Sequence, residues 1–145
     1  MPIIPPNSSK LYTNSQGYRV IAGRRIYFRS SWEVNFALTA QYWKEKNVIK
    51  EWEYEPKTFW FENIKRGVRS YKPDFKITLP DERHYWVEVK GYMDSKSATK
   101  IKRLRKYYPD EKLVVLEKKW FDRFKKDFYF LSKNWENDFT DGELT

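Results

Sequence analysis

The sequence predicts an α/β fold, a single domain in which a central mixed β-sheet is flanked by helices. Apolar residues recur at every second position on both sides of a turn near residues 80–83, which is typical of a β-hairpin. Apolar residues recur at helical spacing in 30–46 and again in 95–107, and a short apolar segment follows at 113–116. Helices and strands alternate and are joined by short connections, as a compact domain requires.

The chain of 145 residues begins with an arm, residues 1–17, whose prolines and Asn-Ser-Ser segment predict no regular structure. The folded domain is expected to span residues 18–135. Its first element is a short basic hairpin over 18–28 that turns at Ala22 and Gly23. Such a hairpin could lie along a phosphate backbone or form a solvated edge, and the sequence leaves both interpretations open.

A helix is predicted from Ser30 to about Lys46, with four apolar side chains on one face: Trp32, Phe36, Ala40 and Trp43. If Ser30 is the N-cap, Glu33 takes the third helical position, where a glutamate completes a capping box. Glu33 is thus a candidate for a structural role and for a catalytic one. The two roles are compatible only if its carboxylate can leave the helix end.

A strand is predicted over 51–56, continued by 59–61, and a basic connection over 62–69 leads into a hairpin over 71–91. Alternating apolar side chains mark its two strands: Phe75, Ile77 and Leu79 in the first, Tyr85, Val87 and Val89 in the second. Pro80-Asp81 between them is typical of a turn. We therefore expect two antiparallel strands joined near residue 82.

This hairpin predicts a pair of carboxylates. With the turn near residue 82, Asp74 falls opposite Glu88 and Lys90, and diagonal cross-strand neighbours lie about 7–8 Å apart or less. Two carboxylates at that separation can share a divalent cation. Glu88 and Lys90 also share a strand face, which adds an ammonium group suited to metal-assisted phosphodiester hydrolysis. Asp81 and Glu117 belong to similar motifs, but the strand rise of about 3.3 Å separates each from its partner acid.

The remaining elements are a helix over 95–107, a short buried strand over 113–116 and a closing amphipathic helix over 120–131. In the first of these helices the predicted buried stripe is Ala98, Ile101 and Leu104. A basic stripe on the same helix supplies candidate DNA contacts or ordinary solvated side chains: Lys96, Lys100 and Arg103. Residues 136–145 carry four acidic and no basic side chains, and we expect them to form a loose acidic tail.

Composition restricts the class of protein. The net charge is +9, from 29 basic and 20 acidic residues, which suggests a polyanionic partner or else a basic protein without one. The absence of cysteine excludes disulfides and cysteine zinc sites, and no apolar run approaches 18 residues or forms a signal-peptide core. These features predict a cytoplasmic protein without a membrane partner. Aromatic residues, 19% of the chain, suit core packing more than base stacking, and the lone His84 suits the surface more than general-base catalysis.

The motifs together resemble the PD-(D/E)xK nuclease superfamily. They are Glu33 on an early helix, Pro73-Asp74-Phe75, and Glu88-Val89-Lys90-Gly91 followed by a basic helix. Among its members the chain is most similar to the phage endonuclease I junction-resolving enzymes, over residues 28–108. The resemblance implies a restriction-endonuclease-like fold for residues 18–135.

The resemblance also implies roles for individual residues. Asp74, Glu88 and the Val89 carbonyl oxygen would bind Mg²⁺, with Mn²⁺ as a substitute and one or two ions per site. Glu33 would reach the same metal, directly or through water, and Lys90 would sit at the scissile phosphate. Arg29 resembles a basic residue near this acid in related resolvases.

The function that the resemblance implies is a Mg²⁺-dependent DNA endonuclease acting on branched DNA such as Holliday junctions. It would work as a homodimer, in the host cytoplasm if a phage encodes it. A sequence-specific or nicking endonuclease of the restriction or transposon type is the first alternative. A non-catalytic basic DNA-binding protein is an alternative of another class, although phosphate binding alone gains nothing from two clustered acids.

Overall fold

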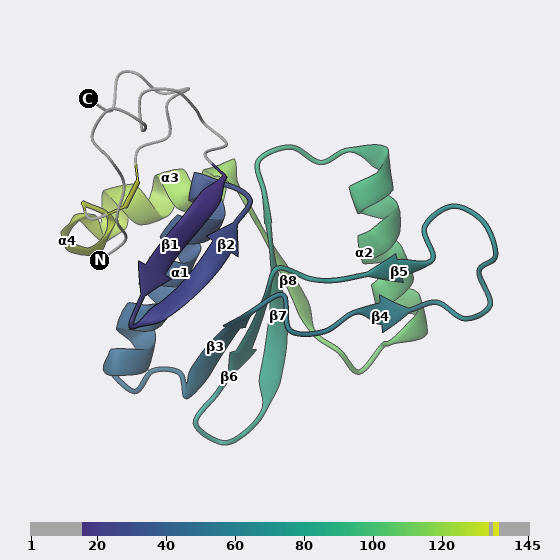
Figure 1. Cartoon of the computed structure of the whole chain (residues 1–145), viewed down its shortest axis with the longest axis horizontal. Helices are drawn as coiled ribbons and strands as arrows, with labels where there is room; N and C mark the ends of the chain where they lie inside the picture. Colours follow the sequence, from purple (N-terminus) through teal and green to yellow (C-terminus); the bar gives the residue numbers. More distant parts are fainter. Residues whose placement is uncertain (1–15, 134, 137–145) are drawn as a thin grey trace. The chain divides into compact units, whose positions relative to one another are not determined.

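The structure, a computed structural model, describes residues 16–133, 135 and 136. These residues form an α/β structure with a mixed four-stranded sheet and four helices (Figure 1). They divide into two compact units: residues up to Lys46 together with those from Trp120 onward, and residues 47–119. None of the described helices is long and apolar enough to cross a membrane. Most of the predicted arm lies outside the described residues, and the nuclease domain over 18–135 stays a prediction.

The first unit begins with the predicted hairpin, which is confirmed. β1 (Gly17–Ile21) pairs antiparallel with β2 (Arg24–Phe28). Ala22 and Gly23 connect them with φ values of 51° and 79°. Positive φ at both central residues is the requirement of a type I′ turn, whose twist matches that of the flanking strands.

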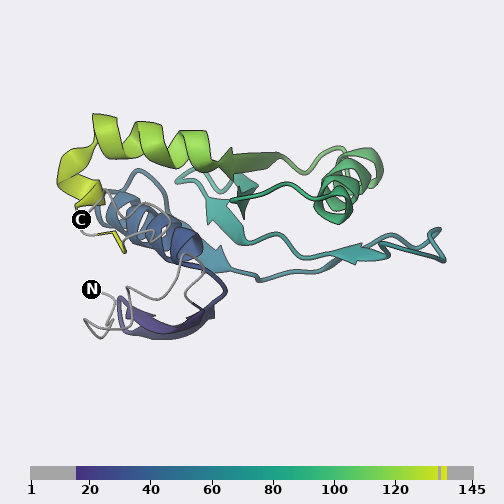
Figure 2. The same cartoon turned by 90° about the horizontal axis from the view of Figure 1, so that it is seen from above.

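Helix α1 (Ser31–Glu45) follows and confirms the predicted helix, with Ser30 as its N-cap. α3 (Lys118–Asp127) lies beside α1, and the rings of Phe36 and Trp120 meet with centroids 6.2 Å apart (Figure 2). The predicted continuous helix over 120–131 is wrong, because Phe128 has an extended φ of −131°. That residue separates α3 from the short α4 (Tyr129–Ser132).

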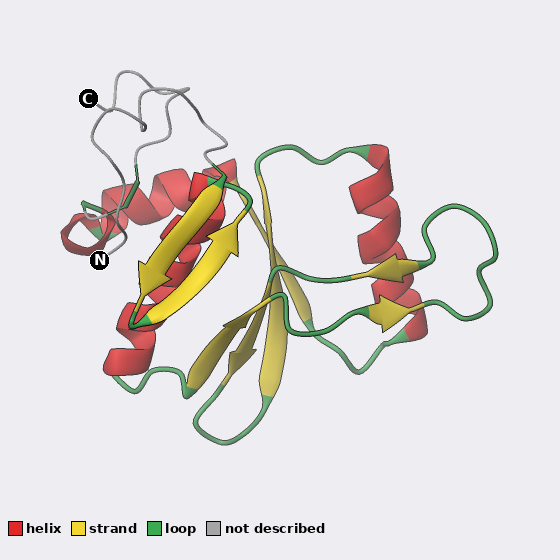
Figure 3. Cartoon of the chain, viewed as in Figure 1, coloured by secondary structure: helices red, strands yellow, loops and turns green. Residues whose placement is uncertain are grey.

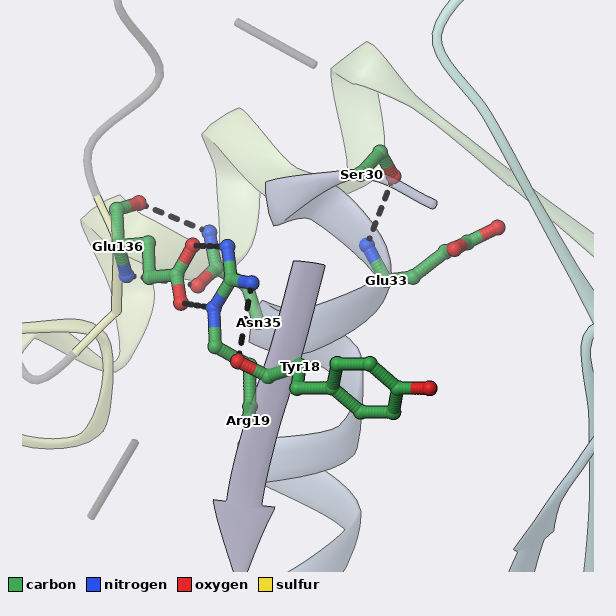
Figure 4. Close-up of polar contacts among 6 residues, drawn as sticks. All are labelled: Tyr18, Arg19, Ser30, Glu33, Asn35 and Glu136. Atoms are coloured by element: carbon green, nitrogen blue, oxygen red, sulfur yellow. Dashed lines mark hydrogen bonds and ion pairs between the residues drawn. The ribbon is translucent and has the colours of Figure 1, made fainter. Parts of the chain in front are cut away.

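The predicted loose tail is wrong at its first residue. The Arg19 guanidinium donates to both carboxylate oxygens of Glu136, at 2.5 and 2.9 Å, and both residues are buried. The Asn35 side chain donates to the Glu136 carbonyl and accepts from its amide, at 3.0 and 2.7 Å (Figure 4). The first unit thus holds residue 136 by four hydrogen bonds. Residues 137–145 lie outside the described part of the chain.

The second unit contains the mixed sheet, which confirms that part of the predicted fold. Its order is β3 (Glu51–Tyr54), β6 (Phe75–Thr78), β7 (His84–Lys90) and β8 (Leu113–Glu117). β3 and β7 both pair antiparallel with β6, whereas β8 runs parallel to β7. Leu113 and Leu116 are buried as predicted, but Val114 is 42% exposed on this edge strand.

The predicted continuation of the first strand into residues 59–61 is wrong. Glu55 has a φ of 48°, and Pro56 has no amide hydrogen to donate, so β3 ends at Tyr54. β4 (Phe59–Trp60) instead pairs with β5 (Ser70–Tyr71) in a separate two-stranded sheet. A loop over 61–69 joins these two strands and extends away from them in Figure 3.

Helix α2 (Ser95–Tyr107) has the predicted bounds and lies beside β5 in the second unit. Its buried stripe is Ser97, Ile101 and Leu104, whereas Ala98, which we expected to be buried, is exposed. Ser97 lies one helical turn before Ile101, so the apolar face is displaced by one residue from the prediction. Ile101 and Leu104 share a core cluster with apolar residues of the strands and loop: Phe59, Phe61, Val68, Tyr71, Trp86 and Leu113.

Candidate active site

The register of β6 and β7 brings Asp74 next to Glu88. The paired residues are Phe75 with Val87 and Ile77 with Tyr85, so continuing the register by one residue sets Asp74 opposite Glu88. Directly opposed residues of an antiparallel pair extend from the same face. The predicted juxtaposition of the two acids is therefore confirmed.

The Asp74 carboxylate is fixed by the backbone of the facing strand. Its Oδ2 accepts a hydrogen bond from the Val89 amide at 2.8 Å. Asp74 is 7% exposed and Glu88 is 6% exposed, so both acids are withdrawn from bulk solvent. Buried carboxylates need hydrogen bonds or a cation to offset their lost hydration.

Tyr71 is a site residue that the sequence reasoning missed. Its hydroxyl donates to Glu88 Oε1 at 2.6 Å, and its ring is buried at the end of β5. Burial raises the pKa of the Tyr71 hydroxyl far above its ordinary value, and the nearby Glu88 and Asp74 charges raise it further. Tyr71 is therefore a permanent donor to the acidic pair. Its position three residues before Asp74 gave no signal, because a tyrosine there fits core packing equally well.

Lys90 lies on the same strand face as Glu88, as predicted. Its Nζ is 3.5 Å from Glu88 Oε2, and its side chain is 23% exposed. Burial raises the pKa of the Glu88 carboxyl, while the Tyr71 hydrogen bond and the Lys90 charge act in the opposite direction. One glutamate thus contacts a neutral donor through one oxygen and a cation through the other.

The donor set suits a hard divalent cation. Asp74 and Glu88 contribute carboxylate oxygens, and the Val89 carbonyl belongs to the residue whose amide holds Asp74. Mg²⁺ is usually bound by one or two carboxylates and keeps several waters, so two acids suffice. Among the described residues, no group of three or more histidine, aspartate or glutamate side chains is arranged to hold a metal. The pKa of Glu88, raised by burial, would fall if a cation bound there.

Glu33 belongs to the first unit, and its membership of this site stays a prediction. Its amide donates to the Ser30 hydroxyl at 3.2 Å, as drawn in Figure 4, so the predicted cap is confirmed. Its Oε1 accepts from the Arg29 amide at 2.9 Å, which displaces the expected capping-box contact by one residue. The Glu33 carboxylate extends away from the Arg19–Glu136 pair in Figure 4.

The candidate DNA contacts differ in how they are held. Lys96 and Arg29 are exposed, and Lys100 is half-buried on α2. The Arg103 guanidinium donates to the Val68 carbonyl and so helps to hold the loop before β5. Arg103 therefore has a structural role that the sequence did not indicate, and its contact with DNA stays a prediction.

The residues that the sequence reasoning set aside lie elsewhere. Asp81 is exposed in the β6–β7 turn, where it pairs with Arg83 at 2.6 Å. His84 is exposed, as expected, and its Nε2 lies 2.9 Å from Glu111. Glu117 is the register partner of Lys90 on β8, a relation that only the parallel pairing reveals.

Comparisons with models of protein families, with curated proteins and with solved structures return no match to this chain. The geometry of the second unit therefore carries the functional argument.

Proposed function

We propose that the protein is a Mg²⁺-dependent DNA endonuclease whose active site contains Asp74, Glu88 and Lys90. The proposal is supported by one arrangement: two buried acids face each other on adjacent strands, and Lys90 Nζ lies 3.5 Å from Glu88. Clustered buried acids are costly for a protein that only binds phosphates, because their charge repels the ligand. The same acids are useful if they hold a cation that the phosphate can approach.

The proposed reaction is hydrolysis of a phosphodiester. A water oxygen bonds to phosphorus, the P–O3′ bond breaks, and the leaving oxygen takes a proton to give a 3′-hydroxyl and a 5′-phosphate. Asp74, Glu88 and the Val89 carbonyl would hold Mg²⁺, which neutralises phosphate charge and lowers the pKa of bound water. Lys90 stabilises the charge that develops on the phosphate oxygens. Tyr71 keeps the Glu88 carboxylate oriented.

The substrate we propose is branched DNA, cut by a homodimer, with a sequence-specific or nicking endonuclease as the alternative. The net charge of +9 supports a polyanionic substrate of either kind. Two related strand scissions favour a dimer with two-fold symmetry.

The test is incubation with four-way junction, nicked and linear duplexes, with and without Mg²⁺. We expect Mg²⁺-dependent cleavage that is strongest on the junction and absent in Asp74→Asn. Asp81→Asn, which removes an exposed turn carboxylate, is the matched control and should cut like the wild type. If the wild type cuts none of these DNAs, or Asp74→Asn cuts them normally, the proposal is wrong. Binding without cutting would favour the non-catalytic DNA-binding alternative.

A further inference from the structure

A hollow of about 500 Å³ on the second unit is lined by three cationic residues and an exposed tryptophan. The cationic residues are Arg69, Lys96 and Lys100, and no acidic residue lines the hollow. Trp60, at the end of β4, is 57% exposed. An indole left in water beside three positive charges is costly as packing and useful as a ligand surface.

The two sides of the hollow come from different elements. Trp60 and Ser70 are paired across the β4–β5 ladder, and Gly67, Val68 and Arg69 end the loop between these strands. Lys96 and Lys100 are separated by one turn of α2, so their side chains lie on the same helix face. Arg103, one turn further along, ties α2 to the Val68 carbonyl. The aromatic side and the cationic side are therefore connected through the backbone.

The hollow adjoins the candidate active site. Arg69 and Ser70 directly precede Tyr71, whose hydroxyl contacts Glu88. The charges of Lys90 and Lys100 both act on Asp94, the N-cap of α2, and help to lower the pKa of its carboxyl, after the stronger effect of its hydrogen bonds from Ser97. Lys100 in the hollow and Lys90 at the acidic pair are thus neighbours of one residue.

We infer that this hollow binds an unpaired nucleotide of a DNA strand, with its base stacked on Trp60 and its phosphates beside Arg69, Lys96 and Lys100. An aromatic platform combined with a cationic groove is the recognition chemistry of single-stranded nucleic acid. Duplex DNA offers the phosphates but keeps its bases stacked inside, so Trp60 would gain little from it. The inference rests on the proposed function in one respect: it names the substrate of that site as DNA with unpaired nucleotides near the cut.

The test measures binding without any divalent cation, so that its outcome is independent of cleavage. Wild type and Trp60→Ala are titrated with a fluorescent ten-nucleotide poly-dT strand, the same strand made abasic, and a ten-base-pair duplex. Stacking one base is worth a factor of about 5 to 150 in affinity. We expect Trp60→Ala to lose a factor in that range on poly-dT and almost nothing on the abasic strand or the duplex.

Two matched controls accompany it. Tyr129→Ala removes another exposed aromatic ring, 71% exposed in α4, and should leave poly-dT affinity unchanged. Lys100→Gln should reduce the salt slope on poly-dT by about 0.7 per lost phosphate contact, whereas Lys102→Gln, exposed on the same helix outside the hollow, should not. The backbone carbonyl of Trp60, which accepts from the Tyr108 hydroxyl, remains in the alanine variant.

An equal loss by Trp60→Ala on all three ligands, or no loss on poly-dT, overturns the inference. If Trp60→Ala does not fold, Trp60→Leu replaces it, and the Lys100 and Lys102 comparison still decides whether the hollow contacts phosphates. A wild type that binds poly-dT as expected but never cuts DNA would contradict the proposed nuclease and leave this hollow in place.

Discussion

Asp74 and Glu88 face each other on adjacent strands, yet each carboxylate is held by a different partner. Asp74 accepts from the Val89 amide at 2.8 Å, and Glu88 accepts from the Tyr71 hydroxyl at 2.6 Å. One acid is thus oriented by the sheet it faces and the other by a side chain of the separate two-stranded sheet. This division gives each part of the proposed metal site its own test.

The first prediction places a cation between the two acids. Crystals soaked in Mn²⁺ should show anomalous density between the Asp74 and Glu88 carboxylates, because both are buried and only two are needed. Asp74→Asn should abolish the peak, while Asp81→Asn should retain it. A peak at Asp81 or Glu117 instead would mean that the Asp74–Glu88 pair is not the metal site.

A second prediction concerns the Tyr71 hydroxyl. Tyr71→Phe keeps the buried ring but removes the donor to Glu88, so Mn²⁺ affinity by calorimetry should fall about 10–100-fold. Tyr108→Phe is the control, since it removes a hydroxyl that donates to the Trp60 carbonyl at 2.6 Å in the same unit. Equal losses of affinity in both variants would show that Tyr71 acts through general stability.

The third prediction follows from the buried Glu88 carboxyl. Burial raises its pKa above the ordinary 4.5, so the unfolded chain loses this proton at lower pH than the folded chain. The folded state is therefore penalised as pH rises from about 4.5 through the folded pKa, and below 4.5 the penalty is absent. In EDTA, Glu88→Gln should gain stability relative to wild type between pH 4 and pH 7.

Urea unfolding at a series of pH values checks this difference, with Glu62→Gln as the matched exposed control. Added Mg²⁺ should then stabilise wild type at pH 7 and leave Glu88→Gln unchanged, because a cation favours the charged carboxylate. A constant difference between wild type and Glu88→Gln across pH would contradict the raised pKa.

Local patterns predicted the acidic pair because period and turn chemistry determine a hairpin's register. Once Pro80-Asp81 is read as the turn, alternation sets the faces, and Asp74 must come near Glu88. The bounds of α2 and the N-cap at Ser30 were also predictable from apolar spacing and capping chemistry. These features depend on neighbours in sequence.

Features that depend on distant contacts were missed. Residues 59–61 continue the alternation of β3, but the positive φ of Glu55 redirects the chain into pairing with β5, which puts Tyr71 on Glu88. Glu136 was assigned to an acidic tail, and only the fold shows Arg19 waiting for it 117 residues away. In both cases composition was correct and the partner lay outside any local window.

The Arg19–Glu136 pair gives a fourth prediction, on stability. Arg19→Met leaves a buried carboxylate without its cation and should cost about 3–5 kcal/mol in free energy of unfolding. Arg123→Met is the matched control, because Arg123 and Asp127 form an exposed pair on α3 worth about 0.3–0.5 kcal/mol. Adding Glu136→Leu to Arg19→Met should restore much of the loss in urea unfolding. If the two single variants are equally stable, Glu136 is not buried against Arg19 in solution.

The final prediction separates chemistry from binding. Lys90 is one of 29 basic residues, so Lys90→Ala should scarcely change DNA affinity. Its ammonium contacts Glu88 at the proposed reacting centre, so it acts mainly in the transition state. Loss of one such group lowers the single-turnover rate by about 100–1,000-fold.

Neutralising Lys96 and Lys100 together should do the reverse. Affinity should weaken and the salt slope on duplex DNA should shrink by about 0.9 per lost phosphate contact, while cutting at saturating protein survives. Arg103 is left intact in this variant because it holds the Val68 carbonyl, and its removal would mix binding with folding. Both proteins are compared on one four-way junction, with affinity measured across salt concentrations and the rate measured with Mg²⁺. A Lys90→Ala protein that cuts at the wild-type rate would remove Lys90 from the chemistry and the nuclease assignment from this site.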